Sequence, residues 1–344
     1  MNIGSLRFDF PVVQAALSWY SDAAMRRVSR SCGAPYALDE VVLDKLIVVR
    51  GRKQRRHLSL SHCDHPIGGQ LMGSDPDTFG PAARELVAAG FDVVDINFGC
   101  PVPKVLGRCR GGFLLSVPKV ALEIVSRVRD AVASHIPVTV KMRRGLDDSP
   151  ASRDNFFEIF DGAFRRGVAA ITVHGRTVQQ RYDGRSCWGF LAEVKRHAGT
   201  HTVLGSGDLF NAQDVMAMLQ QTGLDGVTVA RGAIGNPWIF RECLALWTGQ
   251  KLPEPPTVFE QRAMIIEHYR AAIEIYGAKH GSRCMRKFGI KYARLHPEPV
   301  AVRDAFVSAS TEHDWHKVLE QWYGTDVPGR RVSGDEMDEV CDAA

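Results

Sequence analysis

Several short apolar runs in this sequence end on a residue whose side chain could take part in chemistry. Gln70 and Asn97 carry amides, Lys141 carries an amine and His174 carries an imidazole, and each stands within two residues of the end of a short run with strand character. A single polar residue in such a place is ordinary, because the ends of strands are commonly solvated. A repeated set with this composition instead predicts one shared site.

The elements that would position these residues repeat along the chain. From about residue 10 to 240, short β-branched runs alternate with longer segments whose apolar residues lie three or four apart, the pattern of βα units around a parallel sheet. The predicted strands are Pro11–Ala16, Tyr36–Glu40, Ile67–Met72, Val93–Asn97, Val138–Lys141, Ala170–Val173, Thr202–Leu204 and Gly226–Ala230. The clearest intervening helices are Asp77–Ala89, Pro118–Ala133, Asn155–Arg166 and Asn211–Gln220. Eight βα repeats predict an α/β protein with a TIM (β/α)8 barrel, whose active site lies at the C-terminal ends of the strands.

The pattern changes after Trp247. A proline-rich linker leads into a segment without strand character, so we predict a barrel domain over residues 1–248 and an all-helical C-terminal domain over residues 249–326. The predicted helices there are Thr257–Tyr276, Ser282–Leu295, Pro299–Ala309 and Glu312–Trp322. Residues 327–344 are acidic and poor in apolar side chains, and we expect them to form a disordered tail.

The predicted site suits a flat, redox-active ligand that carries a phosphate. Amide and cationic groups such as Gln70 and Lys141 are suited to the pyrimidine edge of a flavin, where negative charge develops on reduction. Glycine-containing turns at 205–208 and 230–233 follow the last two strands, where this fold usually binds phosphate. The expected cofactor is therefore FMN. A Rossmann dinucleotide domain is not expected, because no Gly-x-Gly-x-x-Gly follows the first strand.

The fourth predicted strand leads into a loop that contains Cys100. An isolated cysteine is more often a small buried apolar residue than a reactive one. Cys100, however, lies between Asn97 and Pro101 at the catalytic end of a strand, with Lys104 close by in the sequence. We expect its thiol to act as a proton donor or nucleophile, whereas we interpret Cys109 as structural.

Five segments together identify a family resemblance. They are Gln70-Leu71-Met72-Gly73-Ser74-Asp75-Pro76, Asp95-Ile96-Asn97-Phe98-Gly99-Cys100-Pro101, Val138-Thr139-Val140-Lys141-Met142-Arg143, Ile171-Thr172-Val173-His174-Gly175-Arg176-Thr177 and Arg231-Gly232-Ala233-Ile234-Gly235-Asn236-Pro237-Trp238. In this order and spacing they resemble the tRNA-dihydrouridine synthases over about residues 8–322. The resemblance implies FMN-dependent reduction of a specific uridine to 5,6-dihydrouridine in structured RNA, most simply tRNA, with NADPH or NADH as reductant. Flavin N5 would deliver hydride to uracil C6, and Cys100 would protonate C5.

The resemblance also assigns residues to the cofactor. The implied flavin contacts are Gln70, Lys141, His174, Ser206, Gly207, Asp208, Ala230 and Arg231. The first strand ends here in Gln14, Ala15 and Ala16, where the family usually has Pro-Met-Ala-Gly, and these residues are also expected at the flavin. Ser206 replaces the family's usual asparagine, which removes one amide but none of the backbone donors.

Binding of RNA requires basic surface. We expect Asn97, Lys104 and Arg176 to contact the substrate near the reacting base, and Arg283, Lys287 and Lys291 to contact phosphates from one face of a helix. A second basic run comprises Arg50, Arg52, Lys53, Arg55 and Arg56. Each run by itself could be an ordinary solvated surface, and the two together favour an RNA partner.

Composition narrows the remaining possibilities. No apolar stretch has the length of a signal peptide or a membrane span, and the eight cysteines include no Cys-x-x-Cys pair, so we expect a cytoplasmic monomer with no membrane partner and no disulfide framework. The sequence 62–65 (His-Cys-Asp-His) precedes the third strand at the non-catalytic end, and no metal is expected there. Three alternatives remain open: reduction of a free pyrimidine or other small molecule, action on ribosomal RNA, and RNA binding with a vestigial flavin site.

Overall fold

The computed structural model describes residues 1–49, 51, 54, 57–61 and 64–333. The chain divides into two compact units. The first comprises Met1–Trp19, Pro35–Asp208 and Ala217–Val229, and the second comprises Tyr20–Ala34, Leu209–Met216 and the described part of Ala230–Ala344. The packing thus groups two earlier segments with the C-terminal helices, and the predicted boundary after residue 248 stays a prediction.

A closed parallel sheet forms the centre of the first unit. Its strands are β3 (Val12–Gln14), β4 (Tyr36–Leu38), β5 (Val42–Leu43), β6 (Ile67–Met72), β7 (Val93–Phe98), β8 (Val138–Arg143), β9 (Ala170–His174), β10 (Thr202–Ser206) and β11 (Gly226–Val229). They are ordered β4-β3-β11-β10-β9-β8-β7-β6-β5, and every neighbouring pair is parallel. A further pairing of β4 with β6 closes the ring and leaves the short β5 outside it. The predicted TIM (β/α)8 barrel is confirmed.

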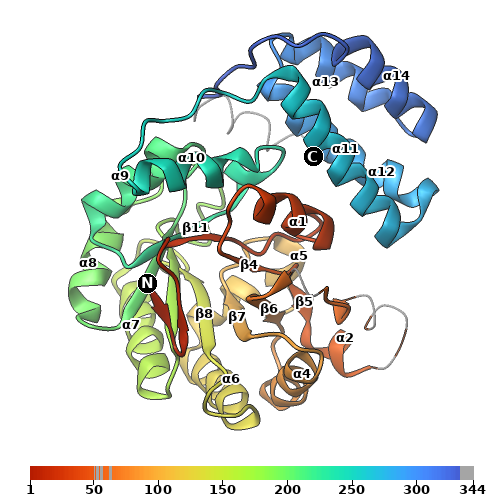
Figure 1. Cartoon of the computed structure of the whole chain (residues 1–344). Helices are drawn as coiled ribbons and strands as arrows, with labels where there is room; N and C mark the ends of the chain where they lie inside the picture. The colour runs from red at the N-terminus through yellow and green to blue at the C-terminus, as the bar shows by residue number, and fades with distance from the viewer. Residues whose placement is uncertain (50, 52–53, 55–56, 62–63, 334–344) are drawn as a thin grey trace. The chain divides into compact units, whose positions relative to one another are not determined.

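Helices cover the outside of this barrel, as Figure 1 shows for α4, α6, α7 and α8. The helical segments of the first unit are α2 (Asp44–Val48), α4 (Pro76–Ala88), α5 (Pro103–Leu106), the 3-10 helix η2 (Gly111–Ser116), α6 (Pro118–Ala131), α7 (Pro150–Arg165) and α8 (Trp188–Ala198), and α9 spans Ala212–Thr222. An antiparallel pair that was not predicted, β1 (Asn2–Ile3) with β2 (Leu6–Arg7), precedes the barrel. Ile3 and Phe8 there pack in one core cluster with Val13 and Tyr36.

The burial of the long barrel strands agrees with their sequences. All six residues of β6 and all six of β7 are buried, which is expected for parallel strands covered on both faces. The start of α7 was predicted at Asn155 but lies at Pro150, because the Ser149 side chain accepts a hydrogen bond from the backbone of Ser152 and caps the helix.

The second unit is helical. Its segments are α1 (Ala23–Ser31), the 3-10 helix η3 (Arg231–Ala233), α10 (Trp238–Trp247), α11 (Val258–Tyr276), α12 (Ala278–Tyr292), the 3-10 helix η4 (Ala293–Leu295), α13 (Pro299–Ser308) and α14 (Glu312–Trp322). Capping boxes fix the starts of α11 and α14, at Thr257 and Thr311. Helix α12 begins four residues before its predicted start at Ser282, directly after Gly277, whose φ of 75° suits glycine.

The predicted disordered tail is wrong for residues 327–333. The backbone of Val327 accepts a hydrogen bond from Val258, and Arg330 donates its backbone N–H to the Leu295 carbonyl at 2.8 Å. Arg331 forms an ion pair with Glu242 at 3.0 Å. These contacts give the segment fixed partners that its composition does not reveal, and residues 334–344 lie outside the described part of the chain.

Among the described residues, no helix is long and apolar enough to cross a membrane.

Candidate active site

The parallel register of the barrel brings several of the predicted site residues together. Gln70 pairs with Asp95, and Asn97 pairs with Lys141. His174 at the end of β9 pairs with both Arg143 and Ser206. These residues therefore lie at the C-terminal edge of the barrel, where this fold carries out chemistry.

A chain of buried side-chain hydrogen bonds links three neighbouring strands at this edge. Asp95 accepts from the Thr139 hydroxyl at 2.5 Å through one carboxylate oxygen and from Gln70 Nε2 at 2.6 Å through the other. Gln70 Oε1 accepts from Asn97 Nδ2 at 2.7 Å. Asn97 Oδ1 in turn accepts the backbone N–H groups of Gly99 and Cys100, each at 3.0 Å. The predicted substrate residue Asn97 is thus the cap of the Cys100 loop.

The Cys100 thiol lies half-buried in a loop held on both sides. Its backbone carbonyl accepts the N–H of Gly112 at 3.0 Å. Gly111 has a φ of 57°, and a Cβ there would approach Cys100 Cβ to 2.8 Å, so only glycine fits beside the thiol residue. Burial raises the pKa of the Cys100 thiol, although a backbone hydrogen bond from Val102 and the cations Arg143 and Lys141 act in the opposite direction. The protonated thiol is therefore the favoured form near neutral pH, which suits a proton donor.

Lys141 is the amine of the site, and its charge depends on pH near neutrality. Burial, together with the neighbouring Arg143, lowers the pKa of Lys141 to about 8, while Asp95 and Cys100 act to raise it. Burial also raises the pKa of Asp95, opposed by the hydrogen bonds from Thr139 and Gln70. A lysine with a pKa this close to neutrality can hold positive charge at neutral pH and lose it in mild alkali.

Arg143 joins the Cys100 loop to the segment after β9. Its Nε donates to the Gly99 carbonyl at 3.0 Å, and its Nη1 donates to the carbonyls of Thr177 and Arg181 at 2.7 and 2.6 Å. Its guanidinium also lies over the ring of Tyr182, 5.6 Å from the centroid. Arg143 is buried, and these contacts indicate a structural role beside the thiol.

The predicted substrate contact of Arg176 is contradicted by its surroundings. Arg176 is fully buried, and its guanidinium donates to the Gly184 carbonyl and pairs with Asp208 at 2.7 Å. The other carboxylate oxygen of Asp208 accepts the backbone N–H of Ser186 at 2.7 Å. The side chains of Arg176 and Asp208 therefore hold the segment after β9 in place. Gly207 has no room for a side chain, because a Cβ would lie 2.4 Å from Ser186 Oγ.

The end of the first barrel strand carries unsatisfied polar atoms. Gln14 is fully buried, and neither its Oε1 nor its Nε2 has a hydrogen-bond partner among the described residues. Such atoms are costly unless a ligand satisfies them. Together with the amide, amine and imidazole groups at neighbouring strand ends, this observation fits the predicted flavin. Ala15 and Ala16 directly follow Gln14, and they present small side chains.

Two predicted phosphate contacts belong to the second compact unit. Ala230 and Arg231 directly follow β11, and Arg231 starts η3. The Arg231 guanidinium lies over the ring of Phe210, 4.9 Å from its centroid. Their contact with a cofactor stays a prediction.

The three basic residues predicted on one face of α12 differ in exposure. Arg283 is exposed, whereas Lys287 is half-buried and lies over the rings of Tyr20 and Phe288, with its Nζ 4.7 and 5.0 Å from the centroids. Lys291 is buried, so the predicted phosphate contact of Lys291 is wrong. Residues four apart advance by about 40° around a helix, and two such steps turn the stripe from solvent toward the core. The second basic run, Arg50, Arg52, Lys53, Arg55 and Arg56, lies outside the described residues.

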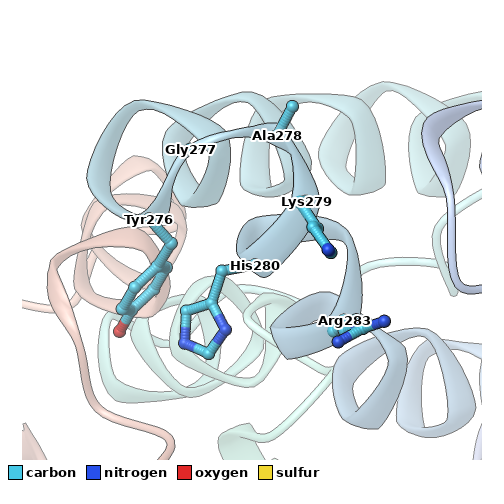
Figure 2. A pocket seen from close by; sticks show the side chains of 6 residues that line it. All are labelled: Tyr276, Gly277, Ala278, Lys279, His280 and Arg283. Carbon is cyan, nitrogen blue, oxygen red and sulfur yellow. The ribbon is translucent and has the colours of Figure 1, made fainter.

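Basic groups instead gather at the start of α12. A pocket of about 450 Å³ is lined there by Tyr276, Gly277, Ala278, Lys279, His280 and Arg283. Figure 2 shows the side chains of Lys279, His280 and Arg283 on the same stretch of the chain. All three are exposed, and this group, which we call the α12 basic cluster, can reach an anionic partner. Lys104 on α5 is likewise exposed.

Metal ligands were not expected, and within residues 1–49, 51, 54, 57–61 and 64–333 no group of three or more His, Cys, Asp or Glu side chains could hold an ion. His62 and Cys63 lie outside this part of the chain.

Sequence reasoning missed three supporting residues: Asp95, Thr139 and Arg143. Each stood inside a segment that was singled out, yet only the strand-end residues received roles. Side chains alternate along a strand, so Asp95 must share the face of Asn97, and Thr139 must share that of Lys141. That alternation is the signal that could have identified both.

Comparison with known sequences gives a consistent result. The family described as dihydrouridine synthase matches residues 13–324. A protein of Mycobacterium tuberculosis named "Probable tRNA-dihydrouridine synthase" is 34% identical over 334 residues, covering 94% of this chain and 85% of the relative. A Synechocystis protein named "Probable tRNA-dihydrouridine synthase 1" is 33% identical, covering 94% of this chain and 90% of the relative.

Solved structures share the fold at much lower identity. An old yellow enzyme homologue from Zymomonas mobilis matches with a TM-score of 0.54 at 14% identity, over 74% of this chain and 93% of that one. Morphinone reductase matches with a TM-score of 0.54 at 16% identity, over 74% of this chain and 90% of that one. At such identities the likeness shows the barrel fold alone.

Proposed function

Because this chain belongs to the dihydrouridine synthase family and is therefore an oxidoreductase, we propose that it reduces a uridine of tRNA to 5,6-dihydrouridine with FMN as cofactor and NADPH or NADH as reductant. The curated relatives are named for tRNA, which supports tRNA over ribosomal RNA as the substrate. We also propose that the protein acts as a monomer in the cytoplasm.

The Cys100 loop is the observation that carries this proposal. Cys100 follows Asn97 at the same barrel edge as Lys141, and its raised thiol pKa keeps the proton available. An acid at this edge can protonate C5 of the uracil ring. Flavin binding alone would not require the Cys100 thiol to be held in a fixed place. The loop that carries it is nevertheless fixed by hydrogen bonds from Gly112 and Arg143.

The residues around the cofactor would bind and orient it. When bound, FMN supplies the hydride that uracil C6 accepts. Gln14, Gln70, Lys141 and His174 would hold the flavin ring, and we propose that Gly207 provides a backbone N–H near its phosphate. The remaining residues of the proposed cofactor set are Ala15, Ala16, Ser206, Asp208, Ala230 and Arg231.

The target base must leave its stack to reach the barrel, at a cost of about a few kcal/mol that contacts to the rest of the RNA offset. We propose that the α12 basic cluster provides part of this binding. The exposure of Lys279, His280 and Arg283 supports this assignment, and Lys287 lies one helical turn after Arg283 on α12. Lys104 would contribute near the reacting base.

The purified protein is expected to bind FMN and to consume NADPH or NADH in proportion to dihydrouridine formed in tRNA. Unmodified tRNA transcripts are incubated with the protein and the nicotinamide, and dihydrouridine is measured by mass spectrometry of nuclease fragments. Free uridine monophosphate and ribosomal RNA are tested in parallel at equal uridine concentration. Reduction of the free nucleotide at the rate seen with tRNA would instead establish a small-molecule reductase, and reduction of ribosomal RNA alone would change the substrate. A protein that binds RNA but retains no flavin would be a binding protein with a vestigial site.

Replacing Lys279 and Arg283 together with alanine is expected to weaken tRNA binding for every sequence. If each contacts a phosphate, the log–log dependence of affinity on salt should become shallower by roughly two units at most. Reduction of FMN by the nicotinamide needs no RNA, so its rate should stay at the wild-type value. Binding is measured by fluorescence anisotropy at several salt concentrations.

The matched control replaces Arg303 and Lys317, two exposed cations on α13 and α14, with alanine. It changes the net charge equally and should alter the salt slope much less. Equal slopes for the two double variants would show that the α12 basic cluster acts only through total charge.

A further inference from the structure

The hydrogen-bond chain Thr139–Asp95–Gln70–Asn97 ends on the backbone of the Cys100 loop. Asp95 and Gln70 are 2% and 1% exposed, so their polar groups have little access to solvent. Each bond in the chain is 2.5 to 3.0 Å long. Breaking one bond would leave a buried donor or acceptor without a partner.

The polarity of this chain is set at both ends. At one end, the N–H groups of Gly99 and Cys100 can only donate, so Asn97 must turn its oxygen toward them and its nitrogen toward Gln70. At the other end, an ionised Asp95 can only accept, so Gln70 must turn its nitrogen toward it. The two requirements agree, because Gln70 Oε1 then faces the nitrogen of Asn97.

We infer that Asp95 is a positioning residue: by fixing the orientation of the Gln70 amide, it fixes Asn97 and so holds the backbone of the Cys100 loop. The expectation that this positioning supports uridine reduction rests on the proposed function, whereas the expectation that it limits access to the Cys100 thiol does not. The hydrogen-bond partners of the Asp95 carboxylate in the described part of the chain are Thr139 and Gln70, neither of which belongs to the Cys100 loop, so Asp95 acts on the loop through two intervening amides.

The arrangement allows a reversal of polarity. In Asn97→Asp, the new carboxylate can still accept both loop N–H groups, but it cannot donate to Gln70 Oε1. Gln70 would then face a carboxylate on either side, with an oxygen turned toward one of them. In the double variant Asp95→Asn with Asn97→Asp, the Gln70 amide can rotate by 180°, accept from the new amide at 95 and donate to the new carboxylate at 97. The Thr139 hydroxyl can still donate to position 95, so every bond is restored.

Alkylation of Cys100 by iodoacetamide reports how well the loop is held, independently of any RNA or flavin chemistry. Trypsin releases Cys100 in the peptide 85–104 and the exposed Cys187 in the peptide 186–195, so the second serves as an internal reference. We expect Asn97→Asp to raise Cys100 alkylation relative to Cys187 by roughly tenfold, the scale for loss of one buried hydrogen bond. The double variant should return it to about the wild-type value. A pH series separates access, read from the plateau, from the thiol pKa, read from the midpoint.

Rescue could also arise because two carboxylates at 95 and 97 repel each other directly. The same pair of variants is therefore made with Gln70→Met, which removes the amide between them. The inference requires that the rescue disappear there. Persistence of the rescue without Gln70, or Cys100 alkylation in Asn97→Asp within twofold of wild type, would overturn it. If Asn97→Asp does not fold, the double variant decides, because it must fold with a protected Cys100.

The link to function is tested separately. Dihydrouridine formation should fall in Asn97→Asp. Activity in the double variant is not expected to return fully, because Asn97 and Gln70 are also proposed contacts of the substrate and the flavin, so the positioning role is judged from Cys100 protection alone. The predicted alkylation pattern in a protein that forms no dihydrouridine would uphold the positioning role of Asp95 and refute the proposed function.

Discussion

Replacing Cys100 with alanine is expected to lower dihydrouridine formation by roughly 100-fold or more, the range for loss of a general acid. FMN retention and its reduction by NADPH should not change, because the thiol is assigned to protonation and the flavin contacts are assigned to other residues. Product is measured by mass spectrometry on unmodified tRNA transcript, and flavin reduction is followed by absorbance without RNA.

The matched control is Cys187→Ala, since Cys187 is an exposed cysteine of the same compact unit. It should keep wild-type activity. Because burial raises the pKa of Cys100, the thiol keeps its proton through neutral pH, so the protonation step should weaken only in alkali, in addition to any loss of rate that follows from the charge of Lys141. Turnover by Cys100→Ala at the wild-type rate would remove the thiol from this role.

Much of the barrel could be predicted because local signals agree with the fold. Strand β6 was predicted with its observed bounds, Ile67–Met72, although the polar Gln70 interrupts its apolar residues, and the burial of all six residues is expected for a parallel strand covered on both faces. Helix α14 was also predicted with its observed bounds, because the capping box that begins at Thr311 marks the start of the helix in the sequence. Active sites of TIM barrels lie at the C-terminal ends of the strands, and this generalisation predicted where Gln70, Lys141 and His174 lie in the fold.

The roles of residues whose hydrogen-bond partners lie far away in the sequence could not be predicted in this way. Arg176 stands two residues after His174 and looks available to a substrate, but Gly184 and Asp208 take its donors. Those partners come together only through the loop conformation after β9. Helix α1 was not predicted for a related reason: it lies between two barrel strands in the sequence, but it packs with α11 of the second unit, more than 200 residues later in the chain.

The error at Lys291 has a geometric origin. Spacing by four residues approximates a helical face over one turn, but the stripe rotates about 40° with each step. Over Arg283, Lys287 and Lys291 the observed exposure falls from exposed through half-buried to buried. The apolar positions of α12 carried this information, since Phe288 and Tyr292 lie next to Lys287 and Lys291 in the sequence.

Replacing Lys141 with methionine is expected to weaken FMN retention and to slow flavin reduction by NADPH by roughly 10 to 100-fold, at or below the effect of removing one preorganised electrostatic donor. Methionine keeps most of the length of the side chain and removes its charge, so the loss isolates electrostatics from packing. Flavin content is measured after gel filtration, and the reduction rate by stopped-flow absorbance without RNA.

The pH dependence of that rate tests the charge itself. The pKa of Lys141 is lowered to about 8 in the protein without cofactor, so its positive charge is present below this pH and is lost as pH rises through it. An anionic ligand would favour the charged form and move this loss to higher pH. Wild-type flavin affinity and reduction rate should therefore decline in alkali, and Lys141→Met should lack this decline because nothing at position 141 titrates.

Lys141→Arg provides the control: arginine stays charged in the same range, so it should remove the pH step while keeping more of the rate than methionine does. An alkaline decline of equal size in all three proteins would assign the titration to another group, and an unchanged flavin content and rate in Lys141→Met would place this cation away from the electron-rich edge of the cofactor.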